Sequence, residues 1–140
     1  MPRVDFYILS DENPSARDLL SCRLAEKACK QGHRVYLHAE SEGHARQLDE
    51  LLWTFRAGSF LPHALLRDNP QPTPPVLIGS GTEAPPVTDV LINLAAAVPD
   101  FFGQFTRIAE IVDPAAKEAG RTRFRFYRDH GCHPESHNIS

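Results

Sequence analysis

The sequence predicts a three-layer α/β domain, with a mostly parallel, twisted sheet of about five strands and helices on both faces. Three observations predict this class. The chain has 140 residues, of which 41% are hydrophobic, and this suits one domain with a single core. Apolar runs such as residues 4–9 are typical of strands that are covered on both faces. A helical segment joins the first two runs, which favours a parallel pair with a right-handed crossover.

The first unit of the chain is a strand, a helix and a second strand. After the strand at residues 4–9, Asn13 offers a helix cap, Pro14 suits the first helical position and Gly32 closes the helix. Residues 33–38 form the second strand. The link before the helix is SDENPS rather than a Gly-x-Gly-x-x-Gly loop, and the chain has no Gly-Lys-Ser/Thr cradle. We therefore expect a Rossmann-like topology without its nucleotide site and without a cofactor.

The second helix begins at a Ser41 cap and carries an apolar stripe. The stripe comprises Ala45, Leu48 and Leu52. Asp49 and Glu50 form a carboxylate pair, but adjacent helix residues point about 100° apart and do not share one substrate as an acid/base couple. A solvated helix face is the favoured interpretation.

The next region, residues 64–86, is rich in proline and holds one short strand at residues 76–78. Because proline removes ladder donors, we expect this strand at a sheet edge. Residues 79–82 read Gly-Ser-Gly-Thr, and prolines rather than a helix follow them, so we interpret them as a turn. Beyond it we expect a strand at residues 89–94, a short helix at 100–105, the last strand at 107–112 and a helix start at Asp113-Pro114.

Composition and sequence pattern argue against several classes of protein. The net charge of −3 argues against nucleic-acid binding over the whole surface. No apolar stretch reaches the roughly 18 residues of a membrane span, and no signal-peptide pattern opens the chain, so we expect a cytoplasmic protein without a membrane partner. The chain has three cysteines and no CxxC pair, which fits reduced thiols. Cys22 and Cys29 are interpreted as small core residues.

An unusual aromatic stretch follows the second helix. The only tryptophan, Trp53, ends the helical pattern, and Phe60 follows a Gly-Ser turn and precedes Leu61, Pro62 and His63. Large apolar groups near the surface tend to mark a partner site. The alternative is that both rings roof a satellite core under the loop, and spacing alone does not decide between the two.

The last helix is basic, with five basic residues and one acidic residue between positions 117 and 128. Lys117, Arg121, Phe124 and Arg128 follow a spacing of i, i+4, i+7 and i+11, which places three cations and one ring on one helical face. Such a stripe suits an acidic peptide that bears a terminal carboxylate and an apolar side chain. A solvated amphipathic helix is the alternative, and residues 123–126 also alternate at strand period.

We expect a single α/β domain over residues 1–128 and a flexible tail over residues 129–140. The tail contains His130, Cys132, His133 and His137, which are metal-ligand residue types. No fixed scaffold is predicted for them, so we expect no metal site and a disordered tail.

The run LDELLWTFRAGSFLPH at residues 48–63 resembles the signature of the chi subunit of the bacterial DNA polymerase III clamp-loader complex. The likeness covers most of the chain and includes the opening strand, the Gly-x-Arg-Val strand start, the DVLINL strand and the final Arg-x-Arg-aromatic segment. The resemblance implies a non-catalytic accessory subunit. It implies two partners, the psi subunit and the acidic, phenylalanine-ending tail of single-stranded-DNA-binding protein, with nucleic acid contacted only indirectly.

Residue by residue, the resemblance places Lys117 and Arg121 at the tail-binding positions and Phe124 where a tyrosine is common. Trp53 and Phe60 fall on the surface that receives psi or, in some bacteria, a helicase, and the adjoining Leu61, Pro62 and His63 are expected to contact the same partner. The segment before Lys117 is shorter than in the family, so the resemblance does not assign the apolar wall of the tail site. Two other classes stay open: an enzyme on a nucleotide-binding-like fold, and direct nucleic-acid binding through the basic helix.

Overall fold

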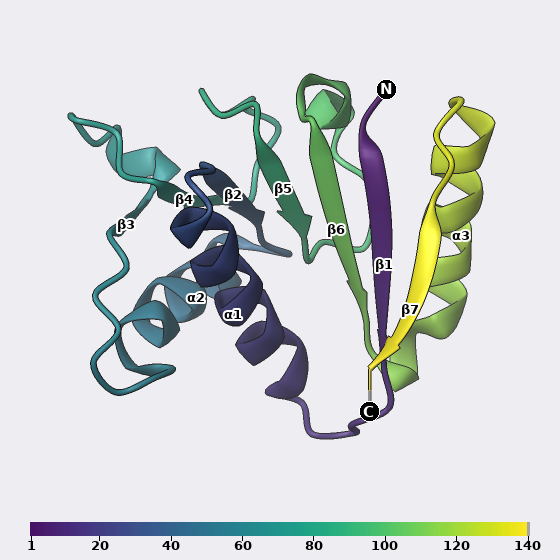
Figure 1. Ribbon diagram of the computed structural model, residues 1–140, viewed down its shortest axis with the longest axis horizontal. Coiled ribbons are helices and arrows are strands. Elements are labelled where there is room, and N and C mark those ends of the chain that lie inside the picture. The colour runs from purple at the N-terminus through teal and green to yellow at the C-terminus, as the bar shows by residue number, and fades with distance from the viewer. Residues whose placement is uncertain (140) are drawn as a thin grey trace.

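The computed structural model describes residues 1–139 and contains one seven-stranded, all-parallel sheet in the order β3-β4-β2-β5-β6-β1-β7 (Figure 1). The strands are β1 (Arg3–Leu9), β2 (Val35–His38), β3 (His63–Leu65), β4 (Val76–Gly79), β5 (Val90–Asn93), β6 (Arg107–Val112) and β7 (Glu135–Ile139). The α-helices are α1 (Ala16–Lys30), α2 (Glu42–Thr54) and α3 (Lys117–Asp129), and the 3₁₀ helices are η1 (Leu66–Asp68), η2 (Asp100–Gln104) and η3 (Pro114–Ala116).

The predicted class is confirmed, and the sheet divides the interior into two apolar layers. The first layer packs under α1 and α2 and includes Leu9, Cys22, Leu37, Leu48, Ile78 and Ile92. The second packs under α3 and η2 and includes Phe6, Tyr36, Leu91, Ile108 and Tyr127. Neighbouring residues of β1 alternate between the two layers, as the period of two along a strand requires. Over residues 1–139, no helix combines the length and the apolarity that a membrane crossing requires.

Two strands were not expected, so the predicted count of about five is too low. β3 pairs with β4, and β4 is therefore an inner strand, not the edge strand that the prolines suggested. β3 has only three residues, all half-buried, and so short a segment gives no periodic signal. The prolines at 70, 72, 74 and 75 lie in the loop between the two strands rather than in the ladder.

The expectation of a flexible tail over residues 129–140 is wrong for residues 135–139. These residues form β7, which pairs in parallel with β1, so β6 is not the last strand. The sequence ESHNI carries little strand propensity of its own. Long-range contacts hold it instead: the His137 ring lies 2.9 Å from the Asp5 carboxylate and stacks on Tyr7.

Local capping follows the sequence in part. The Ser41 hydroxyl accepts a hydrogen bond from the His44 N–H at 3.1 Å and caps α2 as predicted. α1 begins two residues later than expected, because Asn13 accepts from the Ser15 N–H in a turn before the helix. The core positions of Cys22 and Cys29 are confirmed, and burial raises their thiol pKa values to about 12 and about 11.

A buried polar network joins α3 to the sheet. The Glu110 carboxylate of β6 is fully buried and accepts hydrogen bonds from Arg123 Nε at 2.8 Å, Tyr127 Oη at 2.6 Å and Asn93 Nδ2 at 2.9 Å. Arg123 also donates to the Ala96 carbonyl at 3.1 Å. Burial raises the pKa of Glu110, while Arg123, Tyr127 and Asn93 lower it by stabilising the charge. The network fixes α3 in place and orientation.

We predict that Arg123→Ala destabilises the fold by about 3–5 kcal/mol, because it leaves the Glu110 charge buried without its cation. Denaturant unfolding followed by circular dichroism measures the change. Arg125→Ala is the matched control, since Arg125 lies on the exposed side of the same helix, and it should have little effect. Equal stabilities for the two variants would contradict the role of the network.

Candidate functional site

The first candidate surface lies at the end of α2 and is defined by Trp53 and Phe60. The two side chains are 62% and 85% exposed. They therefore do not roof a satellite core, which was the alternative that the sequence left open. The Trp53 ring packs on the His63 ring, with ring centres 4.5 Å apart, and Phe60 stands in the loop that follows α2. Exposed rings on a fixed support are typical of a partner-binding surface. We call this the aromatic surface.

The loop that carries Phe60 is held by Glu26, a residue of α1 that sequence reasoning missed. The Glu26 carboxylate accepts hydrogen bonds from Ser59 Oγ at 2.8 Å and from Arg56 Nη2 at 2.8 Å. Gly58 supplies the turn with a φ of +79°. The Ser59 hydrogen bond and the Arg56 guanidinium lower the pKa of Glu26. Nothing near Glu26 in the sequence indicates this contact, since its partners lie 30 and 33 positions away.

Residues 61–63 do not all reach the aromatic surface. Pro62 is exposed and Leu61 is half-buried against the core. The His63 side chain is fully buried, and its two ring nitrogens lie 2.7 Å from the Leu61 carbonyl and 2.9 Å from the Asp49 carbonyl. Its ring packs 4.5 Å from the Trp53 ring. The buried His63 side chain therefore supports Trp53, and a direct contact of His63 with a partner stays a prediction.

The second candidate surface is a groove of about 300 Å³ between α3 and the end of the sheet. We call it the α3 groove. Its lining consists of Lys117, Gly120, Arg121 and Phe124 from α3, Phe6 and Ile8 from β1, Val112 from β6, and Ser136 and Asn138 from β7. The structure thus brings together three of the four residues of the predicted basic stripe.

The groove has an apolar floor and a cationic rim. Phe6 packs against Phe124 with ring centres 5.2 Å apart, and Ile8 and Val112 complete the floor. The floor comes from strands of the sheet, so the short segment before Lys117 does not remove it. Glycine is needed at position 120 because a Cβ there would lie 2.9 Å from Val112 and push α3 away from β6. At the rim Lys117 and Arg121 are exposed, and Arg121 pairs with Glu118.

Arg128, the fourth residue of the predicted stripe, does not line the groove, and its contact with a peptide stays a prediction. It lies about 16 Å along the helix from Lys117, beyond the end of the groove, and its Nε is 3.9 Å from Asp129. Arg123, another residue of the basic run, is buried against Glu110 and adds no charge to the surface. Residues 123–126 are helical, so the strand-period alternative is excluded.

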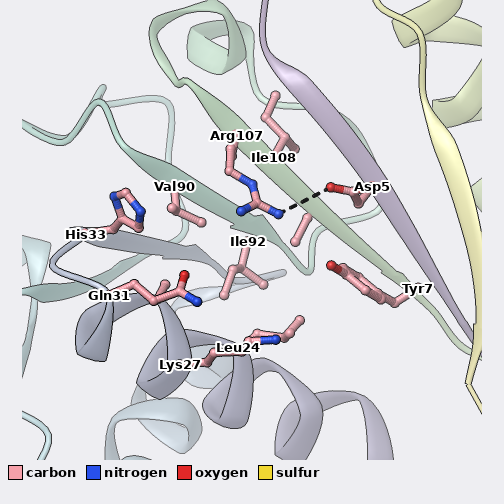
Figure 2. Close-up of a pocket in the computed structure, with 12 residues that line it drawn as sticks. Asp5, Tyr7, Leu24, Lys27, Gln31, His33, Val90, Ile92, Arg107 and Ile108 are labelled. Carbon is pink, nitrogen blue, oxygen red and sulfur yellow. Dashed lines mark ion pairs between the residues drawn. The ribbon is translucent and has the colours of Figure 1, made fainter.

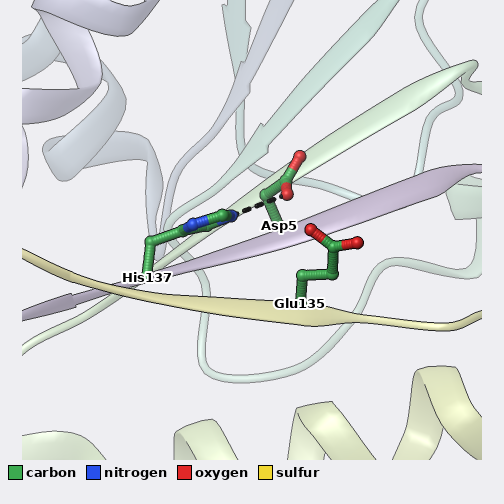
Figure 3. A group of neighbouring side chains, drawn as sticks. All are labelled: Asp5, Glu135 and His137. Carbon is green, nitrogen blue, oxygen red and sulfur yellow. Dashed lines mark hydrogen bonds and ion pairs between the residues drawn. The ribbon is translucent and has the colours of Figure 1, made fainter.

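A third cluster surrounds Asp5 on the opposite face of the sheet. Asp5 lines a small cavity of about 130 Å³ beneath α1, and its buried carboxylate pairs with Arg107 (Figure 2) and with Arg3. Glu135 and His137 of β7 lie beside it, with ligand atoms within 4.8 Å of one another (Figure 3). The positive charges of Arg3 and Arg107 would repel a divalent cation at the Asp5 carboxylate. The cluster is better described as an ion-pair network that fixes β7 to β1.

The carboxyl edge of β4 bears on the nucleotide-binding alternative. Residues 80–83 form an irregular connection without a helix behind it, in agreement with the predicted turn. The cavity there, about 470 Å³, is lined by two carboxylates, Glu42 and Glu83, and by one cation, Arg67, which pairs with Glu42. The carboxylates outnumber the cation, and Glu42 occupies the first turn of α2, where a phosphate would otherwise bind. The geometry does not favour a nucleotide at this edge.

Comparisons with known proteins give one consistent result. The family model described as DNA polymerase III chi subunit, HolC, matches residues 1–135. The protein named DNA polymerase III subunit chi from Pseudomonas aeruginosa is 43% identical over 141 residues, which cover 99% of this chain and 98% of that protein. Proteins of the same name from Haemophilus influenzae and Escherichia coli are 34% and 33% identical over 96% and 91% of this chain, covering 95% and 92% of those proteins.

We predict that Glu26→Ala loosens the loop that carries Phe60 and leaves the rest of the fold unchanged. The variant removes the acceptor of both Arg56 and Ser59. Backbone order parameters from NMR relaxation should fall for residues 56–60 and stay constant in α2. Glu50→Ala, which removes an exposed carboxylate of α2, serves as the control.

The same loop should respond to pH in the wild-type protein. Because the folded protein lowers the pKa of Glu26 from 4.5, the contribution of this contact is present above 4.5 and is lost as the pH falls through the lowered value. Order parameters for residues 56–60 that stay constant through this range, or a Glu26→Ala loop as rigid as the wild type, would contradict the prediction.

Proposed function

The chain belongs to the family of DNA polymerase III chi subunits, and from that membership we propose that it bridges the polymerase complex to the acidic carboxyl-terminal tail of single-stranded-DNA-binding protein. The family is that of a non-catalytic accessory subunit of DNA polymerase III, and it associates with the polymerase complex. The finer assignment of partners to surfaces rests on the geometry of this chain.

The observation that carries the proposal is the α3 groove, in which two cations stand over an apolar floor. A peptide that ends in phenylalanine presents a carboxylate directly beside an aromatic ring. Lys117 and Arg121 fit the carboxylate, and the floor around Phe124 fits the ring. The groove also lies at the start of α3, where the helix dipole favours negative charge. Acidic residues before the terminal phenylalanine suit the same cationic rim.

The aromatic surface is assigned to the psi subunit. Its two exposed rings supply the kind of anchors in which binding energy concentrates. The aromatic surface adjoins β3 and the α3 groove adjoins β7, and these strands are the two opposite edges of the sheet (Figure 1). The two partners therefore do not compete for space, which a bridging subunit requires. A helicase adaptor would use the same aromatic surface, and the identity of the captured partner distinguishes the two functions.

For the aromatic surface we predict that Phe60→Ala weakens binding of the psi subunit by roughly 2 kcal/mol or more. Because Phe60 is 85% exposed, the free energy of unfolding should stay near that of the wild type. Isothermal titration with purified psi measures the first quantity, and denaturant unfolding measures the second. Binding of the tail peptide to the same variant should be unchanged.

Thr54→Ala provides a control, since it changes an exposed position at the end of α2, before the loop that carries Phe60, without removing a ring. Loss of both ligands together with a lower unfolding midpoint would show that Phe60 acts through the fold. Retained psi binding with loss of a helicase would favour the adaptor function.

For the α3 groove we predict that Arg121→Ala weakens binding of an acidic peptide ending in phenylalanine by roughly ten- to a hundredfold, since a charge-assisted hydrogen bond contributes about 1.5–3 kcal/mol. Fluorescence anisotropy with a labelled peptide measures the affinity. Arg125→Ala removes the same charge from a residue outside the groove and should change the affinity little. An equal effect of both variants would indicate unspecific attraction by the basic helix, and an unchanged affinity in Arg121→Ala would refute the site.

A further inference from the structure

β7 is an edge strand, and no other strand within residues 1–139 pairs with its outer side. The sheet ends at β7, and its inner side pairs with β1. The Ile139 carbonyl accepts a hydrogen bond from the Ser10 N–H at 3.1 Å and so faces β1. Backbone groups of successive residues in a strand point to opposite sides. The N–H and C=O groups of Ser136 and Asn138 therefore face outward, away from the sheet.

The same two residues line the α3 groove with their side chains. Ser136 is registered with Phe6 and Asn138 with Ile8, and all four lie on the α3 face of the sheet. The open edge of β7 therefore borders the α3 groove, and we call this edge and the groove together the channel. Figure 1 shows α3 beside β7. A ligand whose end occupies the groove can extend along the edge without leaving the surface.

β7 is also rigidly placed. His137 contacts the buried Asp5 carboxylate at 2.9 Å and stacks on the Tyr7 ring at 5.3 Å (Figure 3). These contacts lie on the opposite face of the sheet, so they hold the strand without occupying the channel. The Glu135 side chain lies on that face as well, and it does not oppose an acidic ligand in the channel. A fixed strand with unpaired outer groups is a template for one more strand.

We propose that the acidic peptide binds as an additional strand on β7, with its terminal carboxylate at Lys117 and Arg121 and its terminal ring on the floor of the α3 groove. This inference rests on the proposed function and adds a mode of recognition. Extended peptides commonly bind in this way, with affinity from the main chain and specificity from a pocket for the side chain. Here the groove supplies the pocket and Ser136 and Asn138 supply the main-chain partners.

The direction of the added strand follows from the position of the cations. α3 begins directly after the carboxyl end of β6, and all strands are parallel, so Lys117 lies near the carboxyl end of β7. A peptide whose terminal carboxylate lies there, and whose preceding residues lie along the edge toward the amino end of β7, is parallel to β7. In a parallel ladder one peptide residue donates its N–H to the Ser136 carbonyl and accepts from the Asn138 N–H. The peptide residue two positions later donates to the Asn138 carbonyl.

This geometry predicts an alternating pattern that can be measured on the wild-type protein. In a labelled peptide of aspartates followed by a terminal phenylalanine, each backbone amide is replaced in turn by an ester, which removes one N–H donor. Esters at every second position should weaken binding by roughly three- to tenfold, and esters between them should have little effect, since a net hydrogen bond is modest in energy. Fluorescence anisotropy gives the affinities.

A variant of the protein tests the β7 partner in these hydrogen bonds. Asn138→Pro removes the outward N–H of β7, and proline is tolerated on an edge strand where its nitrogen faces solvent. Asn138→Ala removes the same side chain and keeps the N–H, so it is the matched control. We expect Asn138→Pro to bind the peptide several-fold more weakly than Asn138→Ala. A thermal melt of each variant shows whether β7 is intact, and if the proline variant is unfolded the ester series decides.

The outcomes separate this inference from the function on which it rests. If the unmodified peptide does not bind, or binds with equal affinity to Arg121→Ala, the proposed function fails. If it binds through Arg121 but all esters have equal affinity and Asn138→Pro matches Asn138→Ala, the tail site stands and strand addition is overturned. An alternating ester pattern together with a weaker proline variant supports strand addition.

Discussion

The buried Glu110–Arg123 pair is the constraint on which the α3 side of the molecule depends. An ion pair without solvent must have nearly ideal partners, because each unpaired charge would cost several kcal/mol. Glu110 has a cation, a phenol and an amide around it, and in residues 1–139 no buried side-chain nitrogen or oxygen lacks a hydrogen-bond partner. The pair fixes the position of α3 on β6. This position sets the width of the α3 groove, and Gly120 permits the close approach of α3 to Val112.

The elements that could be predicted are those whose signal is local. β1, β2, β5 and β6 are rich in apolar and β-branched residues, and the Ser41 cap needs only the three residues after it. β3 and β7 are held by partners that are distant in sequence, and their own residues resemble loop. The prolines beside β4 predict an edge strand, but β3, which covers that edge, is too short to be recognised from the sequence.

The candidate site shows the same division between local and distant information. Helical spacing was sufficient to bring Lys117, Arg121 and Phe124 together, since it depends only on the helix period. Helical spacing does not set where the groove ends, so it does not show that Arg128 lies outside the lining, and it does not show that Arg123 turns inward. The floor of the groove and the Glu26 contact to the Phe60 loop join separate elements. Only the packed fold determines such contacts.

The parallel pairing of β1 with β7 also orders events during synthesis. The α3 groove is built from residues near both ends of the chain, with Ile8 registered against Asn138. All residues of the aromatic surface precede β4 and are synthesised in the first half of the chain. The α3 groove needs Ser136 and Asn138 of β7, the last strand in the sequence, so it cannot be complete until the end of the chain has left the ribosome.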